Sequence, residues 1–305
     1  MIHTSLSFVF FGTDDFSVAV LEELKKAGFI PALIVTAPDR PKGRGLVLTP
    51  PPVKLWALRH GIPILQPETL DSAFNLQLTT DNLQLGVVTS YGIIISKQIL
   101  DIPRRGMLNV HPSLLPKYRG ATPLESQILA GEKEMGVTIM LMDEGVDHGP
   151  IVAQRTLPLS VIPAKAGIQV PTASELRKKL SEEGGKLLAE VMLKWVAGEI
   201  KAIPQDHSKA TYTKKFTKAD GEINLSDDPY RNFLKIQAFE SSIGTYFYAT
   251  SSSPLQRGGA EGGGVKKVRV LIKSAEFKDG KLIITRVIPE GKKEMSYVEF
   301  LRSIR

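Results

Sequence analysis

Short apolar runs alternate with amphipathic stretches through the first two-thirds of the chain. Strands are expected where apolar residues are continuous, and helices where they recur every three or four positions. The apolar run at 8–12 is followed by a stretch at 15–28 with helical spacing, acids early, lysines late and Gly28 as a stop. The same alternation predicts further strands at 32–37, 62–65, 85–90, 106–110, 137–142 and 151–159, and helices at 53–61, 123–131 and 172–198.

Strands that alternate with helices are typical of an α/β fold built on a mainly parallel, doubly wound sheet. After residue 204 this rhythm is lost, and short β-like runs with few helix signals indicate a small β-barrel. We therefore expect a first domain over residues 1–204 and a linker with a second domain over residues 205–305. Gly184 and Gly185 lie inside the long predicted helix, and because glycine disfavours helix we expect a weak point there.

Cysteine is absent from all 305 residues. This excludes disulfides, zinc–thiolate sites and a cysteine nucleophile, and it makes the cytosol the simplest location. No run of about 18 apolar residues occurs, so we expect no membrane span and no membrane partner. The N-terminal stretch lacks a basic region followed by a cleavage site, and we interpret it as the first strand rather than a secretion signal.

The net charge of +7 is unevenly distributed. Residues 1–205 hold 21 Lys and Arg against 20 Asp and Glu, whereas residues 206–305 hold 18 against 12. A basic module beside a nearly neutral one favours a polyanionic partner such as RNA. A merely soluble basic surface accounts for the same charge, so charge alone leaves both interpretations open.

Ligands of open α/β sheets bind beyond the carboxyl ends of the strands, and three segments of this chain fall there. The first, FGTDDFS at 11–17, has one glycine in place of G-x-G-x-x-G. A structural turn in which Asp14 or Asp15 caps the following helix is therefore favoured over a dinucleotide site.

The second segment, NVHPSLLPKYRG at 109–120, ends an apolar strand on two polar side chains. Asn109 and His111 point to the same face because strand side chains alternate, and Pro112 ends the strand. The residues that follow form a stiff loop whose backbone can hydrogen-bond a flat polar ligand. Taken alone, the pattern also fits a capped strand end with a satisfied histidine.

The third segment, MDEGVDHGP at 142–150, is a glycine-punctuated acidic turn whose acids can be ordinary turn residues. Together, however, the segments place an amide, an imidazole and a carboxylate at strand ends of one sheet, which suits acyl transfer without a covalent intermediate. Asn109 and a protonated His111 can donate to a developing oxyanion. Asp147 can hold the imidazolium and help to move a proton off an attacking amine. A serine hydrolase is disfavoured because no nucleophile-elbow motif occurs.

At these residues the sequence resembles the folate-dependent formyltransferases, which share N-V-H-P-S-L-L-P-K-Y-R-G and the downstream D-x-G-x-D-x-G-P. Further matching stretches lie at 10–18, 36–54, 210–223 and 291–302, and they resemble the branch that acts on methionyl-tRNA. The resemblance implies a Rossmann-like formyltransferase domain followed by a barrel resembling an OB-fold. It implies transfer of the formyl group of the co-substrate 10-formyltetrahydrofolate to initiator methionyl-tRNA in translation initiation, with no metal and, we expect, by a monomer.

The resemblance also implies roles for individual residues. Asn109, His111 and Asp147 match the catalytic trio of the family. The matching folate contacts are Ser113, Leu114, Leu115, Pro116, Tyr91 and Gly92. The matching contacts to the tRNA acceptor end are Arg40, Lys42 and Arg44, in a glycine-flexible basic loop for which a solvated turn is the plain alternative.

Some residues depart from the family pattern or stay unexplained. His148 stands where the family often has threonine, and we interpret it as a bystander. The segments 161–171 and 251–264 look like surface insertions. Lys117 and Arg119 can face either the acceptor substrate or solvent.

Four other functions fit parts of the same sequence. A nucleotide-sugar N-formyltransferase would use the same formyl donor, and a glycinamide ribonucleotide enzyme or a formyl-folate hydrolase would share the site. A non-enzymatic RNA-binding module would keep the basic second domain but would have no need of the three polar residues together.

Overall fold

The computed structural model describes residues 6–43, 45–71, 74–75, 78, 82–158, 170–251 and 266–304. The chain forms two compact units. The first comprises Met1–Pro123, Glu134–Leu157 and Arg177–Thr213, and the second comprises Leu124–Lys133, Pro158–Leu176 and Lys214–Arg305. The expected domain boundary between residues 204 and 205 stays a prediction. In the part of the chain that the structure describes, no helix combines the length and apolar character needed to cross a bilayer.

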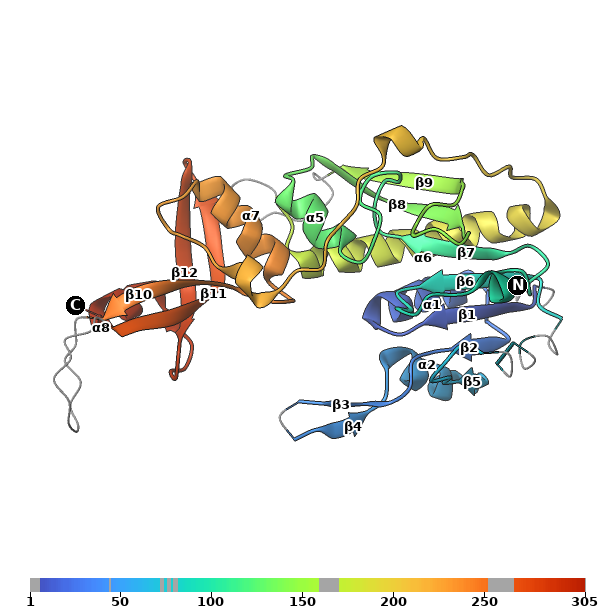
Figure 1. The fold of residues 1–305 in the computed structure, drawn as a ribbon, viewed down its shortest axis with the longest axis horizontal. Coiled ribbons are helices and arrows are strands. Elements are labelled where there is room, and N and C mark those ends of the chain that lie inside the picture. Colours follow the sequence, from blue (N-terminus) through green and yellow to red (C-terminus); the bar gives the residue numbers. More distant parts are fainter. Residues whose placement is uncertain are drawn as a thin grey trace. The chain divides into compact units, whose positions relative to one another are not determined.

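The first unit is built on a seven-stranded sheet in the order β5-β2-β1-β6-β7-β8-β9 (Figure 1). Strands β5, β2, β1, β6 and β7 are parallel to one another, whereas β8 is antiparallel to β7. The mainly parallel α/β sheet expected from the sequence is therefore confirmed. The strands are β1 (Phe8–Gly12), β2 (Leu33–Val35), β5 (Ile64–Leu65), β6 (Leu85–Thr89), β7 (Met107–His111), β8 (Glu134–Leu141) and β9 (Ile151–Pro158).

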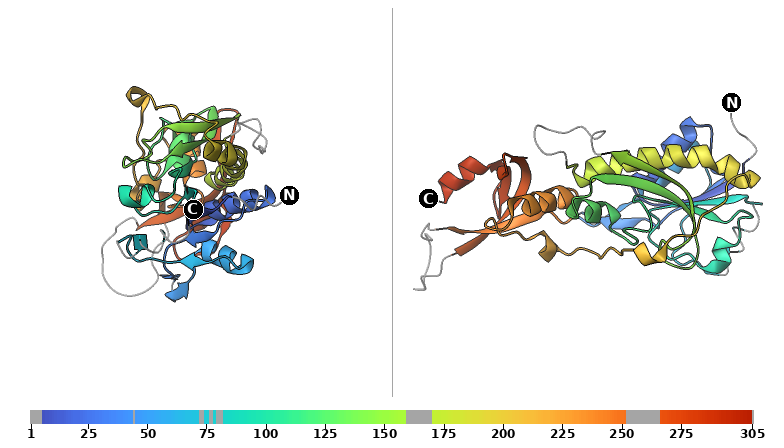
Figure 2. Two further views of the ribbon diagram at one scale, coloured as in Figure 1. Left: turned by 90° about the vertical axis from the view of Figure 1, so that its right-hand side faces the viewer. Right: turned by 90° about the horizontal axis from the view of Figure 1, so that it is seen from above.

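Helices α1 (Asp15–Lys26), α2 (Pro52–His60) and α6 (Ala173–Ala197) run along one side of this sheet (Figure 2). Asp14 caps α1 by accepting from the backbone N–H of Ser17, as the sequence predicted. Gly184 and Gly185 do not break α6. A Cβ at Gly184 would lie 2.6 Å from Val110 Cγ1, so this glycine lets the helix lie close against the sheet.

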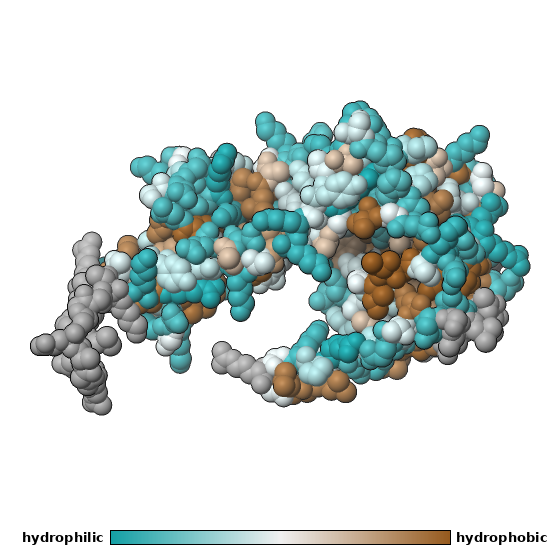
Figure 3. All heavy atoms as spheres, in the orientation of Figure 1, coloured by the Kyte–Doolittle hydropathy of each residue, from teal (hydrophilic) through white to brown (hydrophobic). Residues whose placement is uncertain are grey.

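The segment after β2 forms a two-stranded antiparallel hairpin of β3 (Arg40–Lys42) and β4 (Val47–Thr49). The sequence had indicated only a flexible basic loop. The hairpin also exposes apolar side chains (Figure 3). Leu46, Val47 and Leu48 are 72%, 67% and 63% exposed.

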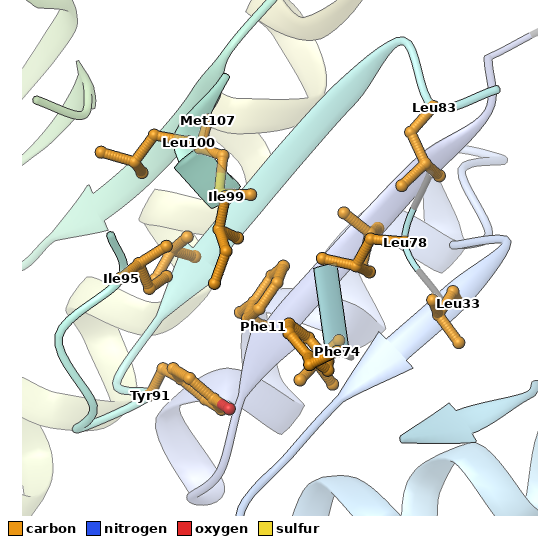
Figure 4. Packing of buried hydrophobic residues seen from close by; sticks show 13 residues of the cluster. Phe11, Leu33, Phe74, Leu78, Leu83, Tyr91, Ile95, Ile99, Leu100 and Met107 are labelled. Carbon is orange, nitrogen blue, oxygen red and sulfur yellow. The ribbon is translucent and has the colours of Figure 1, made fainter. Parts of the chain in front are cut away.

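The opposite face of the sheet is covered by Phe74, Leu78 and α4 (Lys97–Leu100), which enclose an apolar cluster (Figure 4). Phe11 and Met107 belong to this cluster. Because β7 alternates faces, Asn109 and His111 lie on the same side as Met107, whereas Val110 lies toward α6. The polar pair is thus at the carboxyl end of a strand, on the face away from the long helix.

The second unit holds a four-stranded antiparallel sheet in the order β10-β11-β12-β13. Its core includes Val270, Val287 and Phe300. The antiparallel strands agree with a small barrel, and the finer expectation of an OB-fold stays a prediction. The elements of this unit are α5 (Pro123–Leu129, whose Pro123 is in the first unit), η3 (Lys218–Gly221), α7 (Pro229–Phe239), β10 (Thr245–Ser251), β11 (Lys266–Lys278), β12 (Lys281–Pro289), β13 (Met295–Ser296) and α8 (Tyr297–Ser303).

Candidate active site

The structure brings Asn109, His111 and Asp147 together at the end of β7. Asn109 Nδ2 lies 3.4 Å and His111 Nδ1 lies 3.5 Å from the same oxygen, Asp147 Oδ1. The histidine side chain is 5% exposed and the aspartate side chain is 16% exposed. An amide donor, an imidazole and a carboxylate thus meet at one point, although 38 residues separate the first from the last.

The other ring nitrogen of His111 is fixed by the backbone. Nε2 lies 3.0 Å from the carbonyl oxygen of Tyr118. A carbonyl oxygen only accepts hydrogen bonds, so Nε2 carries a proton and donates it. Nδ1 is then the nitrogen that can gain or lose a proton, and it faces the carboxylate of Asp147.

Asp147 occupies a tightly built turn. Its backbone φ of 46° lies in the left-handed region, which is costly for a residue with a Cβ. Its Oδ2 accepts from the backbone N–H of Gly120 at 2.7 Å. A Cβ at Gly149 would collide with the carbonyl oxygen of Leu141, so only glycine fits that position. The turn therefore holds the carboxylate in one orientation.

The loop after β7 is fixed largely by its own hydrogen bonds. Ser113 is fully buried and donates to the carbonyl oxygen of Lys117 at 2.7 Å. The backbone N–H of Leu115 donates to Thr138 Oγ1 at 3.1 Å. Leu114 and Pro116 are half-buried. The side chains of Ser113 and Leu115 face the interior, so a ligand at this loop would meet its backbone and the two half-buried residues.

Tyr91 and Gly92 follow the carboxyl end of β6. Tyr91 is 4% exposed, and its ring lies edge-on to Phe11 at 5.3 Å between centroids (Figure 4). Its hydroxyl has no hydrogen-bond partner within the described residues, and burial raises the pKa of Tyr91 to about 12. Gly92 has φ +82° and open space where a Cβ would stand. This pair provides a neutral phenol under a backbone turn that favours glycine.

Arg119 lies in the interior, whereas the sequence indicated that it faces either the acceptor substrate or solvent. It is 1% exposed, and its guanidinium donates to Gln205 Oε1 at 2.7 and 3.2 Å. Gln205 in turn donates to the carbonyl oxygens of Asp147 and Gly149. Sequence reasoning left Arg119 unexplained and missed Gln205, because no local pattern connects positions 86 apart. Lys117 is exposed.

His148 is 47% exposed at its side chain and lies beside Asp147 in sequence. Its Nδ1 is 2.7 Å from Asp143 Oδ2, and its ring stacks on that of His207 at 4.1 Å. The His148 side chain is therefore contacted by Asp143 and by His207.

The predicted tRNA contacts Arg40 and Lys42 are exposed on β3. Arg40 forms a surface ion pair with Glu68 at 2.7 Å. Arg44 falls outside the described residues, as do nearly all residues of the two predicted insertions, 161–171 and 251–264. Within the described chain, no group of three or more His, Asp or Glu side chains is arranged to hold a metal ion.

Comparison with known proteins identifies the family of this site. The model of the formyl transferase family matches residues 6–192. A methionyl-tRNA formyltransferase from Chloroflexus aurantiacus is 46% identical over 222 residues, which cover 72% of this chain and 69% of the relative. The chain belongs to the formyl transferase family. A methionyl-tRNA formyltransferase from Halalkalibacterium halodurans is 36% identical over 309 residues, covering 97% of this chain and 94% of the relative.

Two solved structures show that this formyl transferase shares its fold with known members. A methionyl-tRNA formyltransferase from Clostridium thermocellum matches with a TM-score of 0.58 at 16% identity, covering 95% of this chain and 99% of the other. An N-formyltransferase from Helicobacter canadensis, in complex with folinic acid and dTDP-3-aminofucose, matches with a TM-score of 0.59 at 18% identity, covering 87% and 95%. The family expected from the 109–120 motif is confirmed.

Proposed function

We propose that the protein transfers the formyl group of 10-formyltetrahydrofolate to the α-amino group of methionine esterified to initiator tRNA. The observation that carries the proposal is the convergence of Asn109, His111 and Asp147 in a chain that is 36% identical to a methionyl-tRNA formyltransferase over 97% of its length. Formyl transfer supplies the modified methionine for translation initiation, so the protein acts in that process.

The first step joins the amine nitrogen to the formyl carbon, and the carbonyl electron pair moves onto oxygen. Asn109 Nδ2 and His111 stabilise that oxyanion by hydrogen bonds that strengthen as the charge develops. The Nε2–H of His111 is committed to the carbonyl of Tyr118. The long 3.5 Å contact of Nδ1 with Asp147 is the one that can open, so a protonated Nδ1 is the donor toward the oxyanion.

The second step removes a proton from the nitrogen and breaks the bond between the formyl carbon and N10 of the folate. Asp147 accepts the amine proton, directly or through one water, and passes it to N10. The oxyanion electron pair re-forms the carbonyl as the C–N10 bond breaks and tetrahydrofolate leaves. The carboxylate suits this role because Gly120 holds only Oδ2, at 2.7 Å, while Oδ1 has the two longer contacts. No covalent enzyme intermediate is needed.

The formyl donor binds, in this proposal, between the turn at Tyr91 and Gly92 and the loop from Ser113 to Pro116. The neutral phenol of Tyr91 and the bare backbone of Gly92 support a flat heterocycle there. Because Ser113 and Leu115 are buried, their contribution is through backbone atoms, while Leu114 and Pro116 offer apolar contact.

The tRNA binds, in this proposal, through the β3–β4 hairpin and the second unit. Arg40 and Lys42 are exposed cations on β3, and Arg44 follows them in sequence. Residues 206–305 hold 18 Lys and Arg against 12 Asp and Glu, which favours phosphate contacts. An OB-like barrel in the second unit, a monomeric state and a cytosolic location are further parts of the proposal.

A comparison of acceptors tests the function. The full chain is incubated with 10-formyltetrahydrofolate and, in parallel, with methionyl-tRNA, an amino-sugar nucleotide or water alone. We expect a formylated product only with methionyl-tRNA. Transfer to the amino-sugar nucleotide instead would establish the alternative of a nucleotide-sugar N-formyltransferase, and hydrolysis at the full rate in water alone would indicate a formyl-folate hydrolase.

A further inference from the structure

The buried guanidinium of Arg119 is connected to the candidate catalytic turn through one intermediate side chain. Its Nη2 and Nε donate to Gln205 Oε1 at 2.7 and 3.2 Å. The Nε2 of Gln205 donates to the carbonyl oxygens of Asp147 and Gly149 at 2.9 and 2.7 Å. Both side chains are buried, at 1% and 5% exposure.

Donor and acceptor chemistry sets the direction of this connection. A guanidinium only donates, so Arg119 requires the oxygen of the Gln205 amide on its side. Carbonyl oxygens only accept, so the NH₂ group must face Asp147 and Gly149. A reversed amide would place the Gln205 oxygen against the two carbonyl oxygens, which are all acceptors. It would also place the NH₂ group against the two N–H groups of Arg119, which are all donors. Arg119 therefore determines which way the Gln205 amide points.

The same backbone also holds the carboxylate of Asp147. Gly120, the neighbour of Arg119, donates its N–H to Asp147 Oδ2 at 2.7 Å. The strand-like pairing of Arg119 with Thr211 and Thr213 fixes this stretch of backbone. Asp147 is thus held at its carbonyl by Gln205 and at its carboxylate by Gly120, although its φ of 46° is unfavourable.

We propose that Arg119 and Gln205 are positioning residues for the reaction, forming a relay that orients Asp147 for proton removal from the amine. The inference rests on the proposed function, because it assigns Asp147 the proton transfer. Gln205 belongs to the segment from Gln205 to Thr213, which precedes the last stretch of the second unit, Lys214–Arg305. The relay makes Gln205 the one residue of this connecting segment that we assign to the catalytic apparatus.

Two substitutions interrupt different steps of the relay. Gln205→Glu keeps an oxygen for Arg119 but removes both N–H donors to the turn. Arg119→Lys keeps the positive charge but loses the planar pair of donors that fixes the amide. Because misplacement by about 1 Å can cost roughly 100-fold in rate, we expect kcat to fall about 10- to 100-fold for Gln205→Glu and less for Arg119→Lys. The KM for each substrate should change less than about threefold.

Ser208→Ala is the matched control. Ser208 lies in the same connecting segment, but its side chain donates to Asp206 rather than to the turn. We expect its kcat to equal that of the wild type. A loss similar to that of Gln205→Glu would show that any change in this segment disturbs catalysis.

A double-mutant cycle separates positioning from a general structural effect. If Gln205→Glu acts through Asp147, it should cause little further loss in a chain that already carries Asp147→Asn. An equal fractional loss in both backgrounds would overturn the proposal.

Hydrogen exchange gives a readout that does not depend on activity. In Gln205→Glu, amides within 142–149 should exchange at least about tenfold faster, while those of α1 stay protected. Unchanged exchange of the turn would refute the relay even if the protein proved to use another acceptor. An inactive wild type with the expected exchange would instead count against the proposed function alone.

Discussion

The backbone N–H of Gly120 donates to the carboxylate of Asp147 at 2.7 Å, which links the loop after β7 to the turn after β8. Asn109 Nδ2 and His111 Nδ1 approach the other oxygen of the same carboxylate, at 3.4 and 3.5 Å. Oδ2 therefore fixes the carboxylate in place, and Oδ1 faces the groups assigned to the reaction. This division leads to a direct test of the assigned roles.

Asp147→Asn should keep the hydrogen bond from Gly120 but lose the group that accepts the amine proton. An asparagine oxygen can still accept from Gly120, but the side chain cannot take a proton from the amine. We expect turnover to fall by roughly 100-fold or more, as for the loss of acid–base catalysis. Steady-state formylation of methionyl-tRNA measures the effect, and thermal unfolding should show a folded variant. Near-normal turnover would remove Asp147 from the mechanism.

His111→Ala should also lower turnover by roughly 100-fold, because it removes a donor to the oxyanion. The substitution leaves the carbonyl of Tyr118 without its partner, so the loop after β7 needs an independent check. His111→Gln offers a side-chain amide toward that carbonyl but cannot become a cation. If His111→Gln matched the wild type, the imidazolium would have no role in the reaction.

The alternation of strands with helices and the shared face of Asn109 and His111 were predictable from the sequence because both depend on short-range periodicity. The meeting of these residues with Asp147 was expected from the two motifs and not from strand direction, because β8, which precedes Asp147, is antiparallel to β7. The Arg119–Gln205 contact was not predictable, since 86 residues separate the pair and each lies outside any periodic stretch. The β3–β4 hairpin was missed because its apolar residues face solvent, contrary to the usual strand pattern.

Gly184→Ala should destabilise the protein although alanine is the better helix former. The gain in helix propensity is about 1 kcal/mol. The added methyl would lie 2.6 Å from Val110 Cγ1, and overpacking of this kind costs about 1–3 kcal/mol or more. We expect a lower free energy of unfolding by denaturant. Lys194→Ala, at an exposed position of α6, is the control and should change stability by less than about 0.5 kcal/mol. A more stable Gly184→Ala would show that the sheet can move away.

Tyr91→Phe tests whether the buried phenol serves structure or ligand binding. The hydroxyl has no partner within the described residues, so its removal should leave stability unchanged or raise it by about 1 kcal/mol. A higher KM for the formyl donor in this variant would indicate that the hydroxyl contacts the folate. An unchanged KM would leave only the ring as a contact.

The same residue predicts a pH dependence. Burial raises the pKa of Tyr91 to about 12, above the value of about 10 expected in the unfolded chain. Between these pH values the folded state keeps the phenol proton that the unfolded state releases. The stability that the protonated Tyr91 contributes is therefore present below pH 10 and is lost as the pH rises toward 12. Unfolding of the wild type and Tyr91→Phe across this range measures it, and the variant should lose stability less steeply.

Removal of charge from the β3–β4 hairpin should weaken the use of tRNA without affecting the formyl donor. Lys42 is exposed on β3, and Arg44 follows it in sequence. If each contacts a phosphate, the Lys42→Ala/Arg44→Ala variant should raise the KM for methionyl-tRNA about tenfold and reduce its salt dependence by about one unit of slope for each contact. Lys26→Ala, an exposed cation of α1 that pairs with Glu23, is the control. Because that pair lies on a helix at the side of the sheet, its loss should change neither KM nor slope. An unchanged salt slope in the hairpin variant would mean that the exposed apolar residues Leu46 and Leu48, rather than the cations, are the part of the hairpin to test next against tRNA.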